Sequence, residues 1–195
     1  DHTPGQRQVR DLEQIKGYYR RRGELDEAGI DALIAGRIAR GTENSGPQRK
    51  AIVELARRHG AVLASHDDAS RAHVAEAVAD GVAIAEFPTT IEAAEASHAA
   101  GIRVLMGAPN LVRGVSHSGN VAAIDLALGG ALDIISSDYI PASLLVAVGR
   151  LTAMDAGYDL PRAVALVTRN PAEAAGLGDR GEIAVGKRAD LVRLG

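Results

Sequence analysis

The stretch that decides the fold is Ala61-Val62-Leu63-Ala64-Ser65-His66-Asp67-Asp68, an apolar run that ends in polar side chains. The same pattern returns in Val82-Ala83-Ile84-Ala85-Glu86-Phe87-Pro88 and in Asp133-Ile134-Ile135-Ser136-Ser137-Asp138. Short apolar runs of this kind predict buried strands. If each strand is followed by a helix, the carboxyl ends of the strands open onto one face, where side chains from distant segments meet. This layout is typical of an enzyme site.

Glycines separate the predicted strands from the segments before them. Gly60, Gly81 and Gly101 each stand before an apolar run, as expected for glycines that end helices in short connections. Thr89 and Glu92 resemble a capping box that starts one of these helices. The sequence therefore predicts parallel strands at about 61–66, 82–87, 103–107 and 133–137. Helices are predicted at 47–59, 69–79, 90–100, 121–128 and 142–154.

The length of the chain bears on which parallel α/β fold it adopts. A closed (β/α)8 barrel needs about 250 residues, so the predicted strands supply only its later half. An open doubly wound sheet also fits the length and the spacing of the glycines. Residues 10–44 predict a long helical insertion, residues 160–177 a helix, and residues 181–192 two short strands joined by a turn.

The composition is that of an ordinary globular protein, with 195 residues, 46% of them hydrophobic and 24% charged, and a formal charge of −3. The mild acidity gives no reason to expect nucleic acid or an anionic membrane as a partner, and no apolar run is long enough to span a bilayer. No signal-like segment opens the chain, so a cytoplasmic location is the default expectation. The oligomeric state stays open, and a homo-oligomer is compatible with the sequence.

The absence of cysteine limits the metal chemistry to His, Asp and Glu ligands, which suit zinc, manganese or iron. His66 is a candidate because an apolar strand ends on it, and Asp67 and Asp68 can orient its imidazole. A buried histidine bonded to the backbone is the alternative. Asp138 follows another strand and can either bind a metal and accept a proton from metal-bound water, or cap the next helix. His2 precedes a Thr-Pro-Gly turn that would fix its direction, although without a family motif the sequence favours a terminal histidine that has no fixed role.

Two further features indicate where a substrate would bind. Glu86 ends the second apolar run, where its carboxylate can join a metal shell or pair with an arginine. The loop at 110–120 contains Arg113, Ser116, His117 and Asn120. A guanidinium, hydroxyls and the backbone amides that open a helix are the groups that phosphate oxygens prefer. Polar loops of this composition are common, which leaves a plain surface loop as the alternative.

The end of the chain resembles the closing signature of the amidohydrolase superfamily, in which the chain leaves a barrel and returns to a small β-sandwich. The resemblance is carried by Asn170-Pro171-Ala172-Glu173-Ala174-Ala175-Gly176-Leu177, Gly181-Glu182-Ile183 and Gly186-Lys187-Arg188-Ala189-Asp190-Leu191-Val192. The inner motifs resemble the branch of the superfamily that hydrolyses ribose 1-methylphosphonate 5-triphosphate in the carbon–phosphorus lyase pathway. These motifs are residues 1–8, 64–69, 85–90, 106–114, 116–120 and 137–141. Val115 departs from that branch, which more often has a second glycine there.

The resemblance implies a fold and its domain division. Residues 1–177 would form the carboxyl-terminal half of a (β/α)8 TIM-type barrel, with the helical insertion at about 10–44. Residues 178–195 would form a segment of the β-sandwich. The superfamily's first-strand His-x-His pair, and the bridging acidic or carboxylated lysine ligand that follows it, do not occur in this sequence. We therefore expect the carboxyl-terminal half of a longer protein, without a complete metal site of its own.

The resemblance also implies the site residues and the reaction. One or two divalent ions (zinc, manganese or iron) would be bound by His2, His66 and Asp138, and Asp138 would be catalytic as well. The substrate, a phosphorylated ribose phosphonate, would be bound by Arg113, His117, Asn120 and Glu86. The implied activity is hydrolysis of the 5-triphosphate to the 5-phosphate and diphosphate.

Two alternatives to this activity remain open. The fold alone does not decide which bond is cleaved, so hydrolysis of a C–N bond, as in a deacetylase or deaminase, is the first. The second is a non-catalytic fragment or scaffold that lacks the amino-terminal metal ligands.

Overall fold

The structure is a computed structural model that describes residues 3–116, 120–154 and 157–193. The chain forms two compact units, residues 1–61 and residues 62–195. Within the described ranges, no helix has both the length and the apolar character needed to cross a membrane.

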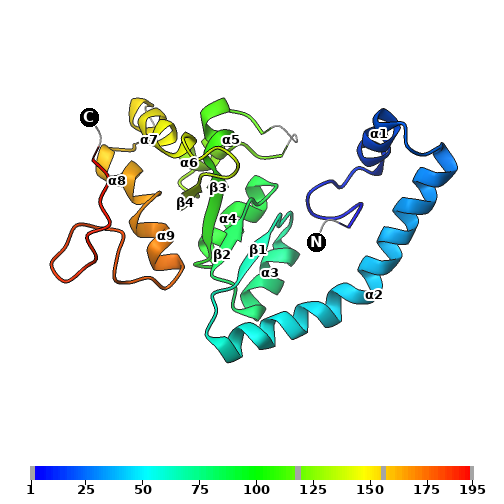
Figure 1. Cartoon of the computed structure of the whole chain (residues 1–195), viewed down its shortest axis with the longest axis horizontal. Helices are drawn as coiled ribbons and strands as arrows, with labels where there is room; N and C mark the ends of the chain where they lie inside the picture. The colour runs from blue at the N-terminus through cyan, green and yellow to red at the C-terminus, as the bar shows by residue number, and fades with distance from the viewer. Residues whose placement is uncertain (1–2, 117–119, 155–156, 194–195) are drawn as a thin grey trace. The chain divides into compact units, whose positions relative to one another are not determined.

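The first unit contains the helices α1 (Leu12–Arg22) and α2 (Glu27–His59), shown in blue and cyan in Figure 1. An aspartate begins each helix, because the side chains of Asp11 and Asp26 accept hydrogen bonds from backbone N–H groups of the first turn. Gly23 ends α1 in the left-handed conformation, at φ 67°. Arg20 of α1 donates two hydrogen bonds to the carboxylate of Glu27, at 2.6 and 2.9 Å. These bonds tie the start of α2 to α1.

The structure corrects the predicted helix boundary near Pro47. The helix α2 runs without interruption over Glu27–His59, so most of the predicted insertion and the helix predicted from residue 47 are one element. Pro47 lacks the N–H that would bond to the carbonyl of Glu43. Glu43 is exposed, so its carbonyl can accept a hydrogen bond from water instead.

The second unit contains a parallel sheet with the strand order β1-β2-β3-β4. The strands are β1 (Ala64–His66), β2 (Ile84–Glu86), β3 (Arg103–Gly107) and β4 (Ile134–Ser136). This arrangement confirms the α/β class and the predicted parallel neighbours, although β1, β2 and β4 are shorter than predicted. His66 pairs with Glu86, and Glu86 pairs with Leu105. Paired residues of neighbouring strands project from the same face, so these three side chains share one face of the sheet.

Helices pack on the opposite face. Val104, Met106 and Ile135 point to that face and join a buried cluster with helix residues such as Leu111 and Leu151. The helices of this unit are α3 (Arg71–Asp80), α4 (Ile91–Ala99), α5 (Ala108–Arg113), α6 (Ala123–Leu128), α7 (Ser143–Ala153), α8 (Leu160–Ala165) and α9 (Arg169–Ala174). The sheet face that carries His66 is less covered, and both His66 and its neighbour Glu86 are only partly buried.

The structure places the start of α4 one residue later than the predicted capping box. Thr90 is the cap, because its Oγ1 accepts a hydrogen bond from the N–H of Ala93 at 3.1 Å. Thr89 stays in the preceding loop, where its N–H donates to the carbonyl of Asp68 at 2.9 Å and its own carbonyl accepts from Val121 at 3.2 Å. The hydroxyl of Thr89 is buried and has no hydrogen-bond partner in the described part of the chain.

Two predicted elements near the carboxyl end are also corrected. The helix predicted at 160–177 is divided into α8 and α9, with the carbonyl of Leu166 between them accepting a hydrogen bond from Ile135 of β4 at 2.9 Å. No strand forms among the described residues 181–193, where Ile183 is 89% exposed, because a strand needs a neighbour to satisfy its backbone. The predicted turn is present, with Lys187 N–H bonded to the carbonyl of Ala184 at 3.2 Å.

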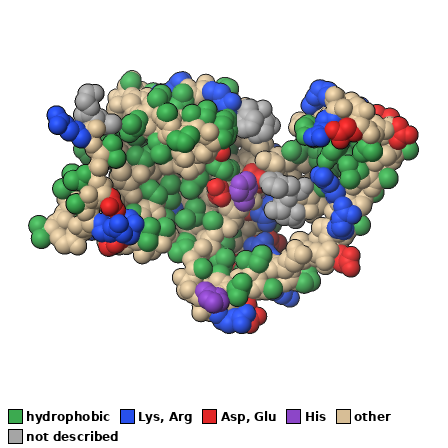
Figure 2. Space-filling view, in the orientation of Figure 1, with side chains coloured by type: hydrophobic (Ala, Val, Ile, Leu, Met, Phe, Trp, Pro, Cys, Tyr) green, Lys and Arg blue, Asp and Glu red, His purple; other side chains and the backbone are tan. Residues whose placement is uncertain are grey.

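Apolar side chains gather over α7 and α8 on the face seen in Figure 2. Exposed apolar residues of these two helices are Leu145, Val146, Leu160 and Val164. They lie outside the buried cluster, which contains Ala147, Val148 and Leu151 from the inner side of α7.

Candidate active site

The backbone turns sharply where the strands end. Asp67 directly follows β1 with φ 59°, Phe87 directly follows β2 with φ 51°, and Asp138 lies just beyond β4 with φ 49°. The left-handed conformation is uncommon for residues other than glycine, and for a bulky residue such as phenylalanine it is a genuine outlier. Strained backbone of this kind persists where the surrounding structure fixes it, and it clusters at functional sites. All three residues lie at the carboxyl ends of the strands, which is the face where the sequence predicts the site.

His66 is held by its neighbour. Its Nδ1 donates a hydrogen bond to Oδ2 of Asp67 at 2.7 Å, and the Asp67 side chain is buried while that of His66 is 40% exposed. This hydrogen bond raises the pKa of the His66 imidazole above its ordinary value, and the negative charge of Glu86 adds to the effect. With Nδ1 bound to a carboxylate, a metal ion would bind His66 through Nε2.

Asp138 lies over the end of β3. A methyl group added to Gly107, the last residue of β3, would lie 3.1 Å from Oδ2 of Asp138 and 3.5 Å from Cε1 of Phe87. The Phe87 ring also meets the His66 imidazole edge to face, with 5.4 Å between the ring centroids. The ends of β1, β2, β3 and β4 therefore each bring one residue to this region of the sheet: His66, Phe87, Gly107 and Asp138.

Glu86 lies beside His66 on the same face of the sheet, as their pairing in the register requires. The sequence left open that Glu86 pairs with an arginine. In the described ranges it forms no such ion pair. The negative charge of its carboxylate helps to raise the pKa of the His66 imidazole.

Arg113 reaches the loop that carries Asp138. Its Nη2 donates a hydrogen bond to the hydroxyl of Tyr139 at 2.8 Å, and Tyr139 directly follows Asp138. Tyr139 is not among the predicted site residues, although an aromatic hydroxyl next to a candidate catalytic aspartate is a signal for one. Arg150 of α7 supports the same region, because it donates a hydrogen bond to the carbonyl of Val112 at the end of α5.

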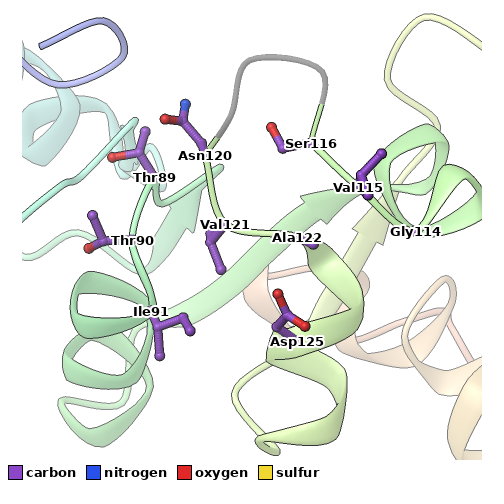
Figure 3. Close-up of a pocket in the computed structure, with 10 residues that line it drawn as sticks. All are labelled: Thr89, Thr90, Ile91, Gly114, Val115, Ser116, Asn120, Val121, Ala122 and Asp125. Atoms are coloured by element: carbon purple, nitrogen blue, oxygen red, sulfur yellow. The ribbon is translucent and has the colours of Figure 1, made fainter. Parts of the chain in front are cut away.

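Ser116 and Asn120 line a shallow pocket of about 490 Å³ together with Thr89 and Thr90 (Figure 3). The pocket lies between the start of α4 and the segment that leads into α6, and Figure 3 shows Thr89 and Asn120 side by side at its upper rim. Its lining combines hydroxyl and amide groups and the carboxylate of Asp125 with apolar side chains such as Ile91 and Val121. It therefore offers hydrogen bonds to a polar ligand.

The predicted metal ligands are described only in part, because His2 lies outside the described residues. His117 of the predicted substrate loop lies outside them as well. Within the described ranges, no three His, Asp or Glu side chains gather closely enough to hold a metal ion. The donor chemistry of His66 and Asp138 nevertheless suits a divalent ion, since one offers an oriented imidazole and the other a carboxylate at the same edge of the sheet.

The parallel sheet, with titratable side chains at its carboxyl end, defines an α/β protein with the layout of an enzyme. The chain belongs to the amidohydrolase family, whose sequence profile matches residues 32–194. This membership confirms the resemblance seen in the closing segment and the inner motifs.

Among curated proteins, the chain is 54% identical over 193 residues to the alpha-D-ribose 1-methylphosphonate 5-triphosphate diphosphatase of Escherichia coli (strain K12). The match covers 98% of this chain and 51% of the relative, so the chain spans about half the length of that protein.

Two crystal structures show a similar fold. One is of an uncharacterized protein, with a TM-score of 0.52 and 22% identity over 73% of this chain and 40% of that chain. The other is of an uncharacterized metal-dependent hydrolase from Pyrococcus furiosus, with a TM-score of 0.52 and 17% identity over 72% of this chain and 35% of that chain. At these identities the likeness concerns the fold.

Proposed function

We propose that this chain is part of a metal-dependent hydrolase that cleaves ribose 1-methylphosphonate 5-triphosphate to the 5-phosphate and diphosphate. The observation that carries the proposal is the 54% identity, along 98% of the chain, to a protein of that name. In this proposal, residues 1–177 form part of a barrel with a helical insertion, and residues 178–195 form part of a β-sandwich. Membership in the amidohydrolase family supports this assignment.

The residues proposed to hold one or two divalent ions are His2, His66 and Asp138. The support for His66 is its position at the end of β1 and the hydrogen bond to Asp67 that leaves Nε2 as the metal-facing nitrogen. When bound, a divalent ion would polarise a phosphoryl oxygen and lower the pKa of a coordinated water. Zinc, manganese and iron all suit these ligand types.

Asp138 is proposed as the proton acceptor. It lies just beyond the end of β4, and its carboxylate lies close to Gly107 at the end of β3. A carboxylate at this position can take the proton of the attacking water, which makes the oxygen nucleophilic at the moment of attack.

Arg113, His117 and Asn120 are proposed to bind the part of the substrate that does not react. A triphosphate carries several negative charges, and a guanidinium binds two phosphate oxygens at once. The hydrogen bond from Arg113 to Tyr139 supports this role, because it directs the guanidinium toward the loop of Asp138. Glu86 is also proposed to contact substrate; its negative charge suits ribose hydroxyls better than phosphate.

The experiment that tests the function is an assay of the full-length protein on the ribose triphosphate, with diphosphate release as the readout. We expect release that stops on chelation and returns when a divalent metal is added. An N-acyl compound assayed in parallel tests C–N bond hydrolysis. Turnover of that compound alone would overturn the proposal, and the absence of turnover on both, with metal bound, would favour a non-catalytic role.

A further inference from the structure

We propose that Phe87 is a positioning residue for this site. Its ring sets the plane of the His66 imidazole, and the same ring reaches the end of β3 at Gly107, next to Asp138. The catalytic consequence rests on the proposed function, whereas the positioning itself is a property of the fold.

The first observation is the contact with His66. The two ring centroids lie 5.4 Å apart, and the ring planes meet at 83°. An edge-to-face pair is the arrangement that the charge distribution of aromatic rings favours. The imidazole is therefore fixed at two points, by the hydrogen bond from Nδ1 to Asp67 and by the Phe87 ring. A hydrogen bond alone lets a ring turn about the line of that bond, and the ring contact removes this freedom.

The second observation concerns Gly107. Its φ is −77°, which any residue adopts, so the backbone does not require glycine at this position. A side chain there would be close to Asp138. An added Cβ would lie 3.1 Å from Oδ2 of Asp138, 3.3 Å from Cβ of Asp138 and 3.5 Å from Cε1 of Phe87. A side chain at residue 107 would thus crowd Asp138, whereas its distance to Phe87 would be that of an ordinary contact. Phe87 therefore meets His66 with its ring and reaches the end of β3, where Asp138 also lies.

The third observation is the backbone of Phe87. A phenylalanine at φ 51° is strained, and its surroundings hold it there. The N–H of Phe87 donates to the carbonyl of Leu105 at 2.9 Å, and the N–H of Thr89 donates to the carbonyl of Asp68 at 2.9 Å. These bonds connect the Phe87 loop to β3 and to the loop after His66. The backbone of Phe87 thus has a conformation better suited to glycine, and this residue carries the aromatic ring that contacts His66.

Core packing is the alternative role for Phe87, because its partly buried ring also packs against the main hydrophobic cluster. The test therefore needs a variant that weakens the core without touching His66. Val167→Ala is suitable, since Val167 is a partly buried residue packed against the same cluster and lies between α8 and α9. Phe87→Leu removes the ring while keeping apolar volume, and Phe87→Tyr keeps the ring.

The first measurement is the NMR signals of the His66 imidazole C–H groups in the metal-free, full-length protein, identified by their loss in His66→Asn. We expect Phe87→Leu to move these signals, because the ring current of Phe87 is lost and the imidazole turns. Phe87→Tyr should keep them near their original positions, and Val167→Ala should not move them. Signals unchanged in Phe87→Leu would overturn the proposal.

The second measurement is turnover of the ribose triphosphate by the metal-loaded protein. Misplacement of a reacting group by about 1 Å can cost about 100-fold in rate, so we expect Phe87→Leu to lower kcat by about 10- to 100-fold with KM changed by less than about threefold. Phe87→Tyr should restore kcat. A loss in kcat no greater than that of Val167→Ala would assign Phe87 to core packing and overturn the positioning role.

Phe87→Met provides an independent variant if Phe87→Leu does not fold, because it also removes the aromatic ring and keeps apolar volume. The His66 signals should move in this variant as well. Unmoved signals in a folded Phe87→Met protein would contradict the positioning role. If the unmodified protein shows no triphosphate hydrolysis, the proposed function fails, while the NMR measurements still decide whether Phe87 positions His66.

Discussion

Asp67 accepts a hydrogen bond from the imidazole of the residue before it, His66, across 2.7 Å. In a continuing strand, successive side chains point to opposite faces, and this contact would not form. The left-handed backbone of Asp67, at φ 59°, turns its carboxylate back toward the imidazole. At the end of β1, the backbone conformation of Asp67 therefore sets the orientation of the His66 imidazole.

Loss of the Asp67 carboxylate should therefore weaken metal binding. We expect Asp67→Ala to lower the affinity of the full-length protein for a divalent ion by about 10- to 100-fold, as is typical when the partner of a metal-bound histidine is removed. Calorimetric titration of the metal-free protein measures this change. Glu95→Gln, an exposed change on α4, is the control and should leave the affinity unaltered. Equal affinities for Asp67→Ala and the control would remove His66 from the metal shell.

Replacing the candidate proton acceptor should affect turnover more than binding. Asp138→Asn keeps the size of the side chain next to Gly107 but loses its basicity. General base catalysis contributes about 100- to 10,000-fold, so we expect kcat to fall within that range while KM changes little. Steady-state kinetics on the triphosphate, with bound metal measured in the same samples, check the prediction. A rise in KM at constant kcat would instead assign Asp138 to substrate binding.

Removal of the Arg113 guanidinium should weaken substrate binding. A hydrogen bond to a charged group contributes about 1.5–3 kcal/mol, so Arg113→Ala should lower kcat/KM by roughly 10- to 150-fold, mainly through KM. Tyr139→Phe, which removes the hydroxyl that Arg113 contacts, should cause a smaller change in the same direction. Unchanged kinetics in both variants would place the 110–120 loop outside the substrate site.

The adjacent threonines before α4 should respond in opposite ways to loss of their hydroxyls. Thr90→Val removes the helix cap and should lower the free energy of unfolding by about 0.5–2 kcal/mol. Thr89→Val removes a buried hydroxyl without a hydrogen-bond partner in the described residues, and should leave the free energy of unfolding unchanged or raise it. Urea denaturation of both variants makes the comparison. A larger loss for Thr89→Val would show that its hydroxyl has a partner in solution, such as a bound water.

The ion pair between α1 and α2 should be visible as a shifted titration. The hydrogen bonds from Arg20 lower the pKa of the Glu27 carboxyl below its ordinary value. Because the folded pKa is depressed, the stabilisation is present above the unfolded pKa of about 4.3 and is lost as the pH falls through the folded pKa. Both side chains are exposed, so the effect is small and weakens in high salt.

Carboxyl NMR shifts of Glu27 followed from pH 7 to pH 2 measure this pKa. Arg20→Gln should return it toward the ordinary value, whereas Arg21→Gln, on the neighbouring position of α1, should leave it low. A Glu27 pKa that is the same in all three proteins would mean that the ion pair does not form in solution.

Local sequence patterns determined the parallel strands and the order of helices between them. Apolar β-branched runs favour strands, and the glycines before them, such as Gly60 and Gly81, end the preceding helices. Both effects depend on residues that are close together in the chain, so the sequence shows them directly. For the same reason the sequence predicted that His66, Glu86 and Asp138 lie at one edge of the sheet, since each follows or ends a strand.

Tertiary structure decided what depends on contacts between distant segments. The carbonyl of Leu166 bonds to β4 and divides a predicted helix, and the backbone bonds of Thr89 move the helix cap to Thr90. The hydrogen bond from Arg113 to Tyr139, the ring contact of Phe87 with His66 and the approach of Asp138 to Gly107 likewise join residues that are far apart in the chain. No local pattern encodes such contacts, because they exist only after the strands have paired and brought their carboxyl ends together.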